Sequence, residues 1–520
     1  MPSSEHSESV SKALTATRDD SFLLLIAFLK LTFHLAVNAL SAYGYFRDEF
    51  YYLACSDRLD WGFVDHPPLS IAILTVIRAV LGDSLVAVRL LPALAGAVTV
   101  YLAGLMAREL GGGTFARILA AIAAFAAPIL LGMNSIYSMN SFDFLVWSLT
   151  AYVLIRIIKT GNQQLWMLLG ALLGVGLMNK IGVMWLGAGI ALGLLISHRS
   201  WLTTRGPWIA GEIALLLFLP YVVWNVANDF AHLEFIRNAT SEKYSSLTAV
   251  KFILEQILLQ NPVSLPLWIG GLWFFFFSDS GKQFRILGIM YATAFAILVI
   301  NQQSKAEYLS PAYPMLFAGG AVWFEQALKG KAAILRPMYV GLVAVSGAIL
   351  SPLAAPVLPV ESYIAYANML GIKPSTAENK ELAELPQFYA DMFGWEELAA
   401  TVITVNGNLS PDEKKRSVIY TQNYGEAGAI EFFGKSYGIT RVISGHNNYY
   451  LWGPGTDSID VVIIVGGDPE DHRQNFESVE LVARSKCRYC MPYENNLPIF
   501  VARKLKRPVR EVWPFTKNFS

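Results

Sequence analysis

The chain alternates long apolar runs with short polar breaks up to residue 360, and then the pattern changes. A helix needs about 20 apolar residues to cross the hydrocarbon core of a bilayer, and about eleven runs approach that length. The predicted spans are 22–41, 85–107, 115–133, 142–158, 164–179, 181–198, 207–224, 262–278, 284–301, 309–328 and 335–356. From Glu361 onward, polar residues, Gly and Pro take over, which predicts a water-soluble domain.

Two stretches decide how these spans are oriented. The stretch 69–82 is short, carries Arg78 and follows Pro67-Pro68, so we predict a juxtamembrane helix there. The stretch 164–198 is interrupted by Asn179-Lys180, and a lysine at the bilayer centre costs at least about 2.5–3.5 kcal/mol. We therefore divide this stretch into two short spans, with Lys180 at an interface.

Basic residues support this arrangement, because short loops rich in Lys and Arg face the cytoplasm. All the short basic loops then fall on one side; they contain Arg108, Arg117, Arg156, Lys159, Arg199, Arg205, Lys282, Arg285, Lys329, Lys331 and Arg336. We predict a cytoplasmic tail (1–21), a transmembrane domain (22–360) with its first outer loop at 42–84, and an extracytoplasmic α/β domain (361–520). The expected location is the cytoplasmic (inner) membrane of a bacterium.

Composition agrees with a polytopic α-helical membrane protein. Hydrophobic residues make up 54% of the chain and charged residues 15%, against about 25% charged residues in a typical soluble domain. The high apolar content excludes disorder as a dominant feature, and the balance of 40 basic and 40 acidic residues excludes a dominant basic nucleic-acid surface. Three cysteines are too few for a disulfide scaffold, and the pair Cys487 and Cys490 suits either a local disulfide or two packed thiols.

Asp48 and Glu49 are adjacent carboxylates at the outer end of the first span. A carboxylate near a low-dielectric boundary has a raised proton affinity, so this pair suits general base catalysis. The alternative is a solvated interfacial pair neutralised by Arg47.

Asp65 and His66 stand directly before Pro67-Pro68, which fixes the backbone and starts a helix. They suit contact with a phosphate, a metal or a sugar hydroxyl, and Asp65 also suits helix capping. With His232 they offer metal-ligand types, but without a tightly spaced motif such as H-E-x-x-H. The sequence therefore requires no cofactor and leaves a divalent metal open.

Further candidates lie at the same predicted face. Asp143 lies one turn into a predicted apolar helix. An acid inside a membrane segment usually has a function. The alternative is a first-turn acid whose negative charge is favoured by the helix dipole. Lys180 could neutralise a phosphate at the membrane surface. The alternative is an ordinary lysine that extends its ammonium into the interface. Trp224, Asn225 and Tyr308 suit substrate contact or a simple aromatic belt.

The C-terminal region predicts a small α/β domain. Its β-rich runs are 417–421, 440–444, 459–465 and 499–502. Residues 426–437 predict a helix that ends at Gly438.

Taken together, these segments resemble the superfamily of protein O-mannosyltransferases and lipid A aminoarabinose transferases, which has the C-type glycosyltransferase fold. The motifs that carry the resemblance over about 1–330 are Arg47-Asp48-Glu49, Asp65-His66-Pro67-Pro68-Leu69, Val88-Arg89-Leu90, Asp143, Lys180, Pro220-x-x-x-Trp224-Asn225 and Tyr308-x-x-Pro311-x-Tyr313-Pro314. A distal stretch that begins at Asn423-Tyr424-Gly425-Glu426-Ala427-Gly428 is similar to the tails of many bacterial members.

The resemblance implies a sugar donor carried on polyprenyl phosphate, with Asp48 as the catalytic carboxylate and Glu49 beside it. Aminoarabinose transferases have Glu-Lys where this chain has Asp65-His66, so we assign the phosphate contact to Lys180. The substrate-binding residues predicted on this basis are Asp65, His66, Asp143, Lys180, Trp224, Asn225 and Tyr308.

The predicted function is transfer of a hexosyl or pentosyl group from polyprenyl phosphate to a hydroxyl of a glycan, lipid or protein, with inversion at the anomeric carbon. The leaving lipid phosphate is already a stable anion, so activating the acceptor hydroxyl is the step that needs a base. The alternative is a secondary transporter or lipid-sugar flippase, a class that places its site near the bilayer midplane, often between interrupted helices of two repeats.

Overall fold

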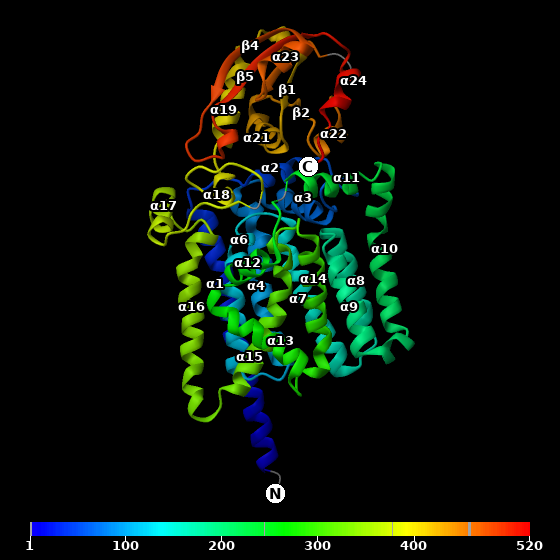
Figure 1. Ribbon diagram of the computed structural model, residues 1–520, viewed down its shortest axis with the longest axis vertical. Coiled ribbons are helices and arrows are strands. Elements are labelled where there is room, and N and C mark those ends of the chain that lie inside the picture. Colours follow the sequence, from blue (N-terminus) through cyan, green and yellow to red (C-terminus); the bar gives the residue numbers. More distant parts are fainter. Residues whose placement is uncertain (1–2, 244, 377, 456–458) are drawn as a thin grey trace. The chain divides into compact units, whose positions relative to one another are not determined.

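The computed structural model describes residues 3–243, 245–376, 378–455 and 459–520, which fall into two compact units (Figure 1). The first, here called the membrane unit, comprises Met1–Ser41, Val86–Pro220 and Ser246–Leu358. The second, here called the sheet unit, comprises Ala42–Leu85, Tyr221–Ser245 and Pro359–Ser520. The sheet unit thus groups the first predicted outer loop with the C-terminal region.

The membrane unit is built from apolar helices that run side by side (Figure 1). They are α1 (Ser3–Leu40), α4 (Leu85–Glu109), α5 (Thr114–Phe125), α6 (Pro128–Met133), α7 (Met139–Thr160), α8 (Leu165–Asn179), α9 (Val183–Ser197), α10 (Gly206–Ala227), α12 (Ala249–Leu259), α13 (Leu265–Phe277), α14 (Arg285–Asn301), α15 (Tyr313–Ala327) and α16 (Leu335–Ala354). The last residues of α10 belong to the sheet unit.

Length and composition make many of these helices suited to a membrane. Within the described residues, 6 helical segments are long and apolar enough to cross one: Ser21–Leu40, Leu85–Glu109, Met139–Thr160, Gly206–Ala227, Lys282–Asn301 and Gly330–Ala354. Shorter apolar helices include Leu165–Asn179 and Val183–Ser197. The predicted class, a polytopic α-helical membrane protein with a small C-terminal α/β region, is confirmed.

Two helix breaks test the predicted spans. The division of 164–198 is confirmed, because α8 ends at Asn179 and Lys180 has an extended backbone. The predicted span 115–133 is instead two helices, α5 and α6. Pro128 restricts Ala127 to an extended conformation and lacks the N–H that would continue the helix, which explains the break.

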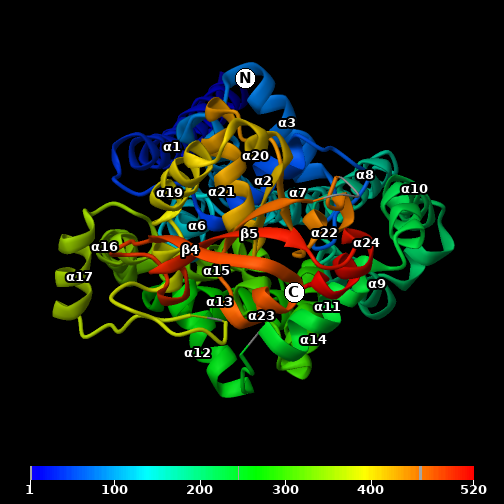
Figure 2. The ribbon, with the colours of Figure 1, turned by 90° about the horizontal axis from the view of Figure 1, so that it is seen from above.

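The sheet unit begins with α2 (Arg47–Ser56) and α3 (Leu69–Leu81), and α3 confirms the helix predicted at 69–82. The further helices are α11 (Ala231–Asn238), α17 (Val360–Met369), α18 (Gln387–Ala390), α19 (Trp395–Asn408), α20 (Pro411–Arg416), α21 (Tyr424–Gly434), α22 (Asn448–Trp452), α23 (Pro469–Asn475) and α24 (Val509–Val512). The helix α19 packs beside α21 (Figure 2).

The five strands form one mixed sheet in the order β2-β1-β3-β5-β4. They are β1 (Ser417–Thr421), β2 (Val442–Ser444), β3 (Val461–Val465), β4 (Phe476–Ser485) and β5 (Leu497–Leu505). β1 is parallel to β2 and β3, whereas β5 is antiparallel to β3 and β4. The core of the sheet contains Val418, Ile443, Ile459, Val462, Ile464, Phe500, Ala502 and Val509. The sequence predicted every strand except β4, an edge strand whose side chains are mostly exposed.

Glycines let α21 approach α2 closely. A Cβ at Gly425 would lie 2.5 Å from Cγ of Arg47, and a Cβ at Gly428 would lie 2.7 Å from the backbone carbon of Phe50. Because the obstacle at Gly428 is backbone, it cannot rotate away. The first turn of α21 is therefore held against the first turn of α2.

We expect Gly428→Ala to lower the stability of the protein by about 1–3 kcal/mol, the usual range for overpacking a close contact. The matched control is Gly407→Ala in α19, where a Cβ would meet nothing within 4 Å. A glycine-to-alanine change inside a helix should stabilise by roughly 0.5–1 kcal/mol. Thermal unfolding of both variants in detergent measures the difference, and an equal midpoint would contradict the packing described.

Candidate active site

The two carboxylates that begin α2 have different surroundings. Glu49 is fully buried, and its Oε2 accepts a hydrogen bond from the backbone N of Phe46 at 2.7 Å, which caps the helix. The side chain of Asp48 is 38% exposed. Both acids lie in the first turn, where the helix dipole favours negative charge. Asp48 is therefore the carboxylate that a substrate in solvent can reach, whereas Glu49 holds the backbone.

Arg47 is almost buried and is surrounded by carboxylates. Its guanidinium nitrogens lie 3.3 Å from Asp48, 3.6 Å from Asp391 and 3.9 Å from Glu378. Its Nη1 also donates to the Tyr493 hydroxyl at 3.0 Å. The pair of Arg47 and Asp48 that the sequence suggested is therefore present, but as one part of a buried network.

Asp391 is the most buried acid of this network, with 1% of its residue exposed. Burial raises the pKa of its carboxyl to about 6, although Arg47 opposes this rise. Asp48 and Glu378 raise it further, because like charges disfavour ionisation. Its backbone oxygen accepts hydrogen bonds from the Arg47 N–H and the Trp395 indole, at 2.9 and 2.8 Å, so the start of α2 is fixed by main chain as well.

Asp65 and His66 lie in a tight turn before α3. The Tyr51 hydroxyl donates to Asp65 Oδ1 at 2.9 Å, and His66 Nε2 lies 3.8 Å from the same oxygen. The Nδ1 of His66 donates to the Pro67 carbonyl. The residue at the N-cap of α3 is Pro68, so Asp65 does not cap this helix.

Residues from two distant segments hold the backbone of this turn. Asn448 Oδ1 accepts from the Val64 N–H at 2.6 Å, and the His232 ring donates to the Val64 carbonyl at 2.9 Å. Burial lowers the pKa of His232 to about 4, so it is neutral at physiological pH. Asn225 Oδ1 accepts from the His232 backbone N–H, and the Trp224 indole donates to Asp60 at 2.8 Å. Trp224 therefore contacts Asp60, and Asn225 contacts His232, the residue that binds this turn.

The remaining predicted residues cluster in the membrane unit. Lys180 Nζ lies 2.7 Å from Asn140 Oδ1 and 3.3 Å from Asp143 Oδ2, and it lies 4.6 Å from the centre of the Tyr308 ring. Asp143 is 2% exposed. The partner of Asp143 that the sequence left unknown is therefore Lys180.

The described residues contain no group of three or more His, Cys, Asp or Glu side chains placed to hold a metal ion.

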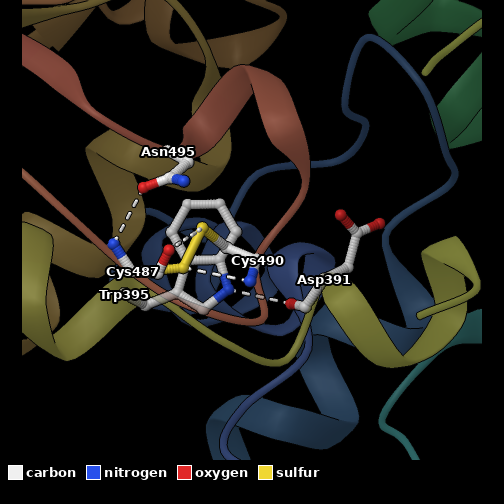
Figure 3. Close-up of a disulfide and its surroundings, with 5 residues drawn as sticks. All are labelled: Asp391, Trp395, Cys487, Cys490 and Asn495. Carbon is white, nitrogen blue, oxygen red and sulfur yellow. Dashed lines mark hydrogen bonds between the residues drawn. A yellow bond between two sulfur atoms is a disulfide. The ribbon is translucent and has the colours of Figure 1, made fainter. Parts of the chain in front are cut away.

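Cys487 and Cys490 form a disulfide (Figure 3). Asn495 Oδ1 accepts from the Cys487 N–H at 3.0 Å, which closes the turn around it. This turn carries Tyr493, the hydroxyl that binds Arg47. Of the two states that the sequence left open, the structure has the disulfide.

Glu426 and Glu494 form a second buried acidic pair beside this turn. The Asn423 amide donates to both, at 2.9 Å to Glu426 and 3.0 Å to Glu494. Burial raises the pKa of both carboxyls, to about 7 for Glu494. The physical reason is that two desolvated carboxylates repel, so the pair retains a proton.

The network around Asp48 contains residues that sequence reasoning did not assign to the site. They are Tyr51, Glu378, Asp391, Tyr424, Asn448 and Tyr493. Tyr424 lies in the distal motif that carried the family resemblance, which was a usable signal. Asn448 lies farther along the same distal stretch, and Tyr51 follows the Asp48-Glu49 pair in the first outer loop. Glu378, Asp391 and Tyr493 stand in segments without a distinctive pattern.

The chain is similar to known proteins both in sequence and in fold. Residues 65–224 match the sequence model of the dolichyl-phosphate-mannose-protein mannosyltransferase family. ArnT from Cupriavidus metallidurans bound to undecaprenyl phosphate superposes with a TM-score of 0.58 at 14% identity, over 92% of this chain and 97% of that chain. The chain has the C-type glycosyltransferase fold. The resemblance predicted from the sequence is confirmed.

Other solved structures share the C-type glycosyltransferase fold with this chain. The archaeal oligosaccharyltransferase AglB from Archaeoglobus fulgidus gives a TM-score of 0.51 at 10% identity, over 85% of this chain and 69% of that chain. The mycobacterial arabinofuranosyltransferase AftD gives 0.52 at 13% identity, over 93% of this chain and 42% of that chain. No curated protein sequence matches the chain.

The acidic pair predicts a pH dependence of stability. A glutamate in the unfolded chain loses its proton near pH 4.5, whereas Glu494 keeps its proton up to about pH 7 in the folded protein. The folded state binds more protons in this window, so this pair makes stability fall as pH rises from about 4.5 to 7. Glu494→Gln should remove this contribution and stabilise the protein at pH 7.5 by about 1–3 kcal/mol.

Unfolding midpoints measured between pH 4.5 and 7.5 test this expectation. The control is Glu396→Gln, which alters an exposed glutamate in the same unit and should follow the wild type. Parallel curves for Glu494→Gln and the wild type would show that the pair holds no extra proton.

Proposed function

We propose that this chain is a membrane glycosyltransferase that moves a hexosyl or pentosyl group from a polyprenyl-phosphate donor to an acceptor hydroxyl. The observation that carries the proposal is Asp48, an accessible carboxylate held by buried partners within the fold that ArnT adopts with undecaprenyl phosphate. The match of residues 65–224 to a family of dolichyl-phosphate-mannose-dependent enzymes supports the same donor class.

In the proposed reaction, Asp48 acts as the general base. Its carboxylate takes the proton of the acceptor hydroxyl, and the acceptor oxygen attacks the anomeric carbon from the side opposite the phosphate. The bond from the anomeric carbon to the phosphate oxygen breaks, and its electron pair stays on the polyprenyl phosphate. A single displacement of this kind inverts the anomeric configuration. Glu49 contributes by capping the helix that presents Asp48.

We propose that Lys180 contacts the donor phosphate and stabilises the charge that develops on it. Its ammonium already binds Asp143 and Asn140, which orients it. Phosphate binding then requires Lys180 to share its three N–H donors between these partners and the donor. Tyr308 covers the same ammonium and completes this part of the proposed donor site.

Asp65, His66, Trp224 and Asn225 are proposed to form the substrate-binding part of the sheet unit; the Asp65 side chain is 19% exposed, and the other three residues are buried. The hydrogen bonds from Tyr51 to Asp65 and from Trp224 to Asp60 hold these side chains in fixed positions. A glycan, lipid or protein hydroxyl is the proposed acceptor. The uneven distribution of basic loops supports an active site on the extracytoplasmic face of a bacterial cytoplasmic membrane.

We expect Asp48→Asn to lower sugar transfer by at least about 100-fold, because an amide cannot accept the proton. The control is Asp57→Asn, which removes an exposed carboxylate directly after the same helix. A panel of undecaprenyl-phosphate-linked hexoses and pentoses is offered to the solubilised proteins together with an envelope extract from a deletion strain. Release of undecaprenyl phosphate is measured by mass spectrometry. Full activity of Asp48→Asn would exclude this base, and a wild type that consumes none of the offered donors would favour the alternative of a flippase.

The proposed orientation predicts a labelling pattern. Cysteine introduced at exposed Leu59 or Glu470 should react with a membrane-impermeant maleimide in intact cells, and cysteine at Asn162 only after permeabilisation. The wild type gives the blank, because Cys55 is buried and the other two cysteines are disulfide-bonded. Labelling of position 162 in intact cells would overturn the span assignment.

A further inference from the structure

The C-terminal region places one side chain directly on the proposed base. The hydroxyl of Tyr424, at the start of α21, donates a hydrogen bond to Asp48 Oδ1 at 2.9 Å. Arg47 Nε contacts the same oxygen at 3.3 Å. Among the described residues, Oδ2 has no hydrogen-bond partner. The two donors therefore fix the carboxylate through one oxygen and leave the other to accept a proton.

Several independent contacts fix the position of the Tyr424 hydroxyl. The residue is 6% exposed, and the centre of its ring lies 4.8 Å from that of Tyr51, 4.6 Å from that of His446 and 5.7 Å from the Arg47 guanidinium. Its backbone N–H donates to His446 Nδ1 at 3.4 Å. The preceding Asn423 caps α21 through its side chain. A buried phenol with these neighbours has little freedom to point elsewhere.

We propose that the C-terminal domain is part of the catalytic centre, with Tyr424 as a positioning residue for Asp48. This inference rests on the proposed function. Tyr424 holds Oδ1, so Oδ2 meets the acceptor hydroxyl in one orientation. In the transfer step the acceptor O–H bond breaks and the Oδ2–H bond forms, while the new glycosidic bond replaces the bond to the phosphate. Tyr424 keeps its own proton throughout and donates to Oδ1.

The charged and neutral groups around Asp48 determine how much its carboxylate depends on the Tyr424 hydroxyl. The groups that interact with the Asp48 carboxylate are Arg47 on its own helix, Asp391 from the segment before α19, and Tyr424 and His446 from the C-terminal domain. Burial lowers the pKa of His446 to about 3, so it is neutral and adds no cation. Burial also raises the pKa of the Tyr424 phenol, so it stays a donor.

The test compares Tyr424→Phe with Tyr449→Phe in the full-length protein. Both residues are buried phenols that donate to a carboxylate, because the Tyr449 hydroxyl binds Glu431 Oε2 at 2.8 Å. Both changes therefore remove the same atom from the same domain. The assay follows undecaprenyl phosphate release from the donor that the wild type consumes, at varied donor concentration and pH, with thermal unfolding as a check on folding.

Tyr424→Phe should lower kcat by about 10- to 100-fold, as expected for losing a hydrogen bond to a charged group, with the donor KM within about 2-fold. Tyr449→Phe should keep kcat within about 2-fold.

Fluorotyrosine at position 424, which restores the hydroxyl, should restore most of kcat even if the phenylalanine variant folds poorly.

The outcomes separate this inference from the proposed function. Equal kcat for Tyr424→Phe and the wild type, with Asp48→Asn inactive, would overturn the positioning role and leave the glycosyltransferase in place. An equal loss in Tyr424→Phe and Tyr449→Phe would also overturn it, since that result indicates general packing. A wild type that consumes no lipid-linked sugar would instead contradict the proposed function itself.

Discussion

The guanidinium of Arg47 sets a constraint on which much of the sheet unit depends. A charged group that leaves water must be paired and hydrogen-bonded, because an isolated buried charge is strongly unfavourable. Arg47 meets this demand with Asp48, Glu378 and Asp391, and with the Tyr493 hydroxyl. These partners come from widely separated parts of the chain, so satisfying one cation brings those parts together around the start of α2.

The topology of the C-terminal α/β region helps to bring its side chains to the start of α2. Parallel strands β1 and β2 end at the same edge of the sheet, and the segments that follow them carry Asn423 and His446. In such sheets, functional residues usually stand just beyond the carboxyl ends of the strands. Here that edge contacts the helix that bears Asp48, and the glycines of α21 permit the close approach. The domain thereby supports a carboxylate that lies nearly four hundred residues earlier in the chain.

The membrane unit provides a contrasting environment for charge. Lys180 and Asp143 lie among apolar helices, where each ion depends on the other for neutralisation. The break between α8 and α9 allows this pairing, because Lys180 leaves the helix at that point and has an extended backbone. Lys180, the proposed phosphate ligand, is therefore not a free cation. It is paired with Asp143 and also binds Asn140.

The sequence by itself determined the membrane class, most helix positions and the break at Asn179-Lys180, because apolar length and a charge in an apolar run are local properties. It also singled out Asp48, Asp65 and Lys180 by residue type and order. Only the tertiary structure decided which carboxylate of the pair at 48–49 is accessible and which residues surround it. Tyr424, Asp391 and Asn448 could not be predicted as neighbours of this segment. Their contacts arise from long-range packing, and hydrogen bonds between distant segments leave no periodic pattern in the chain.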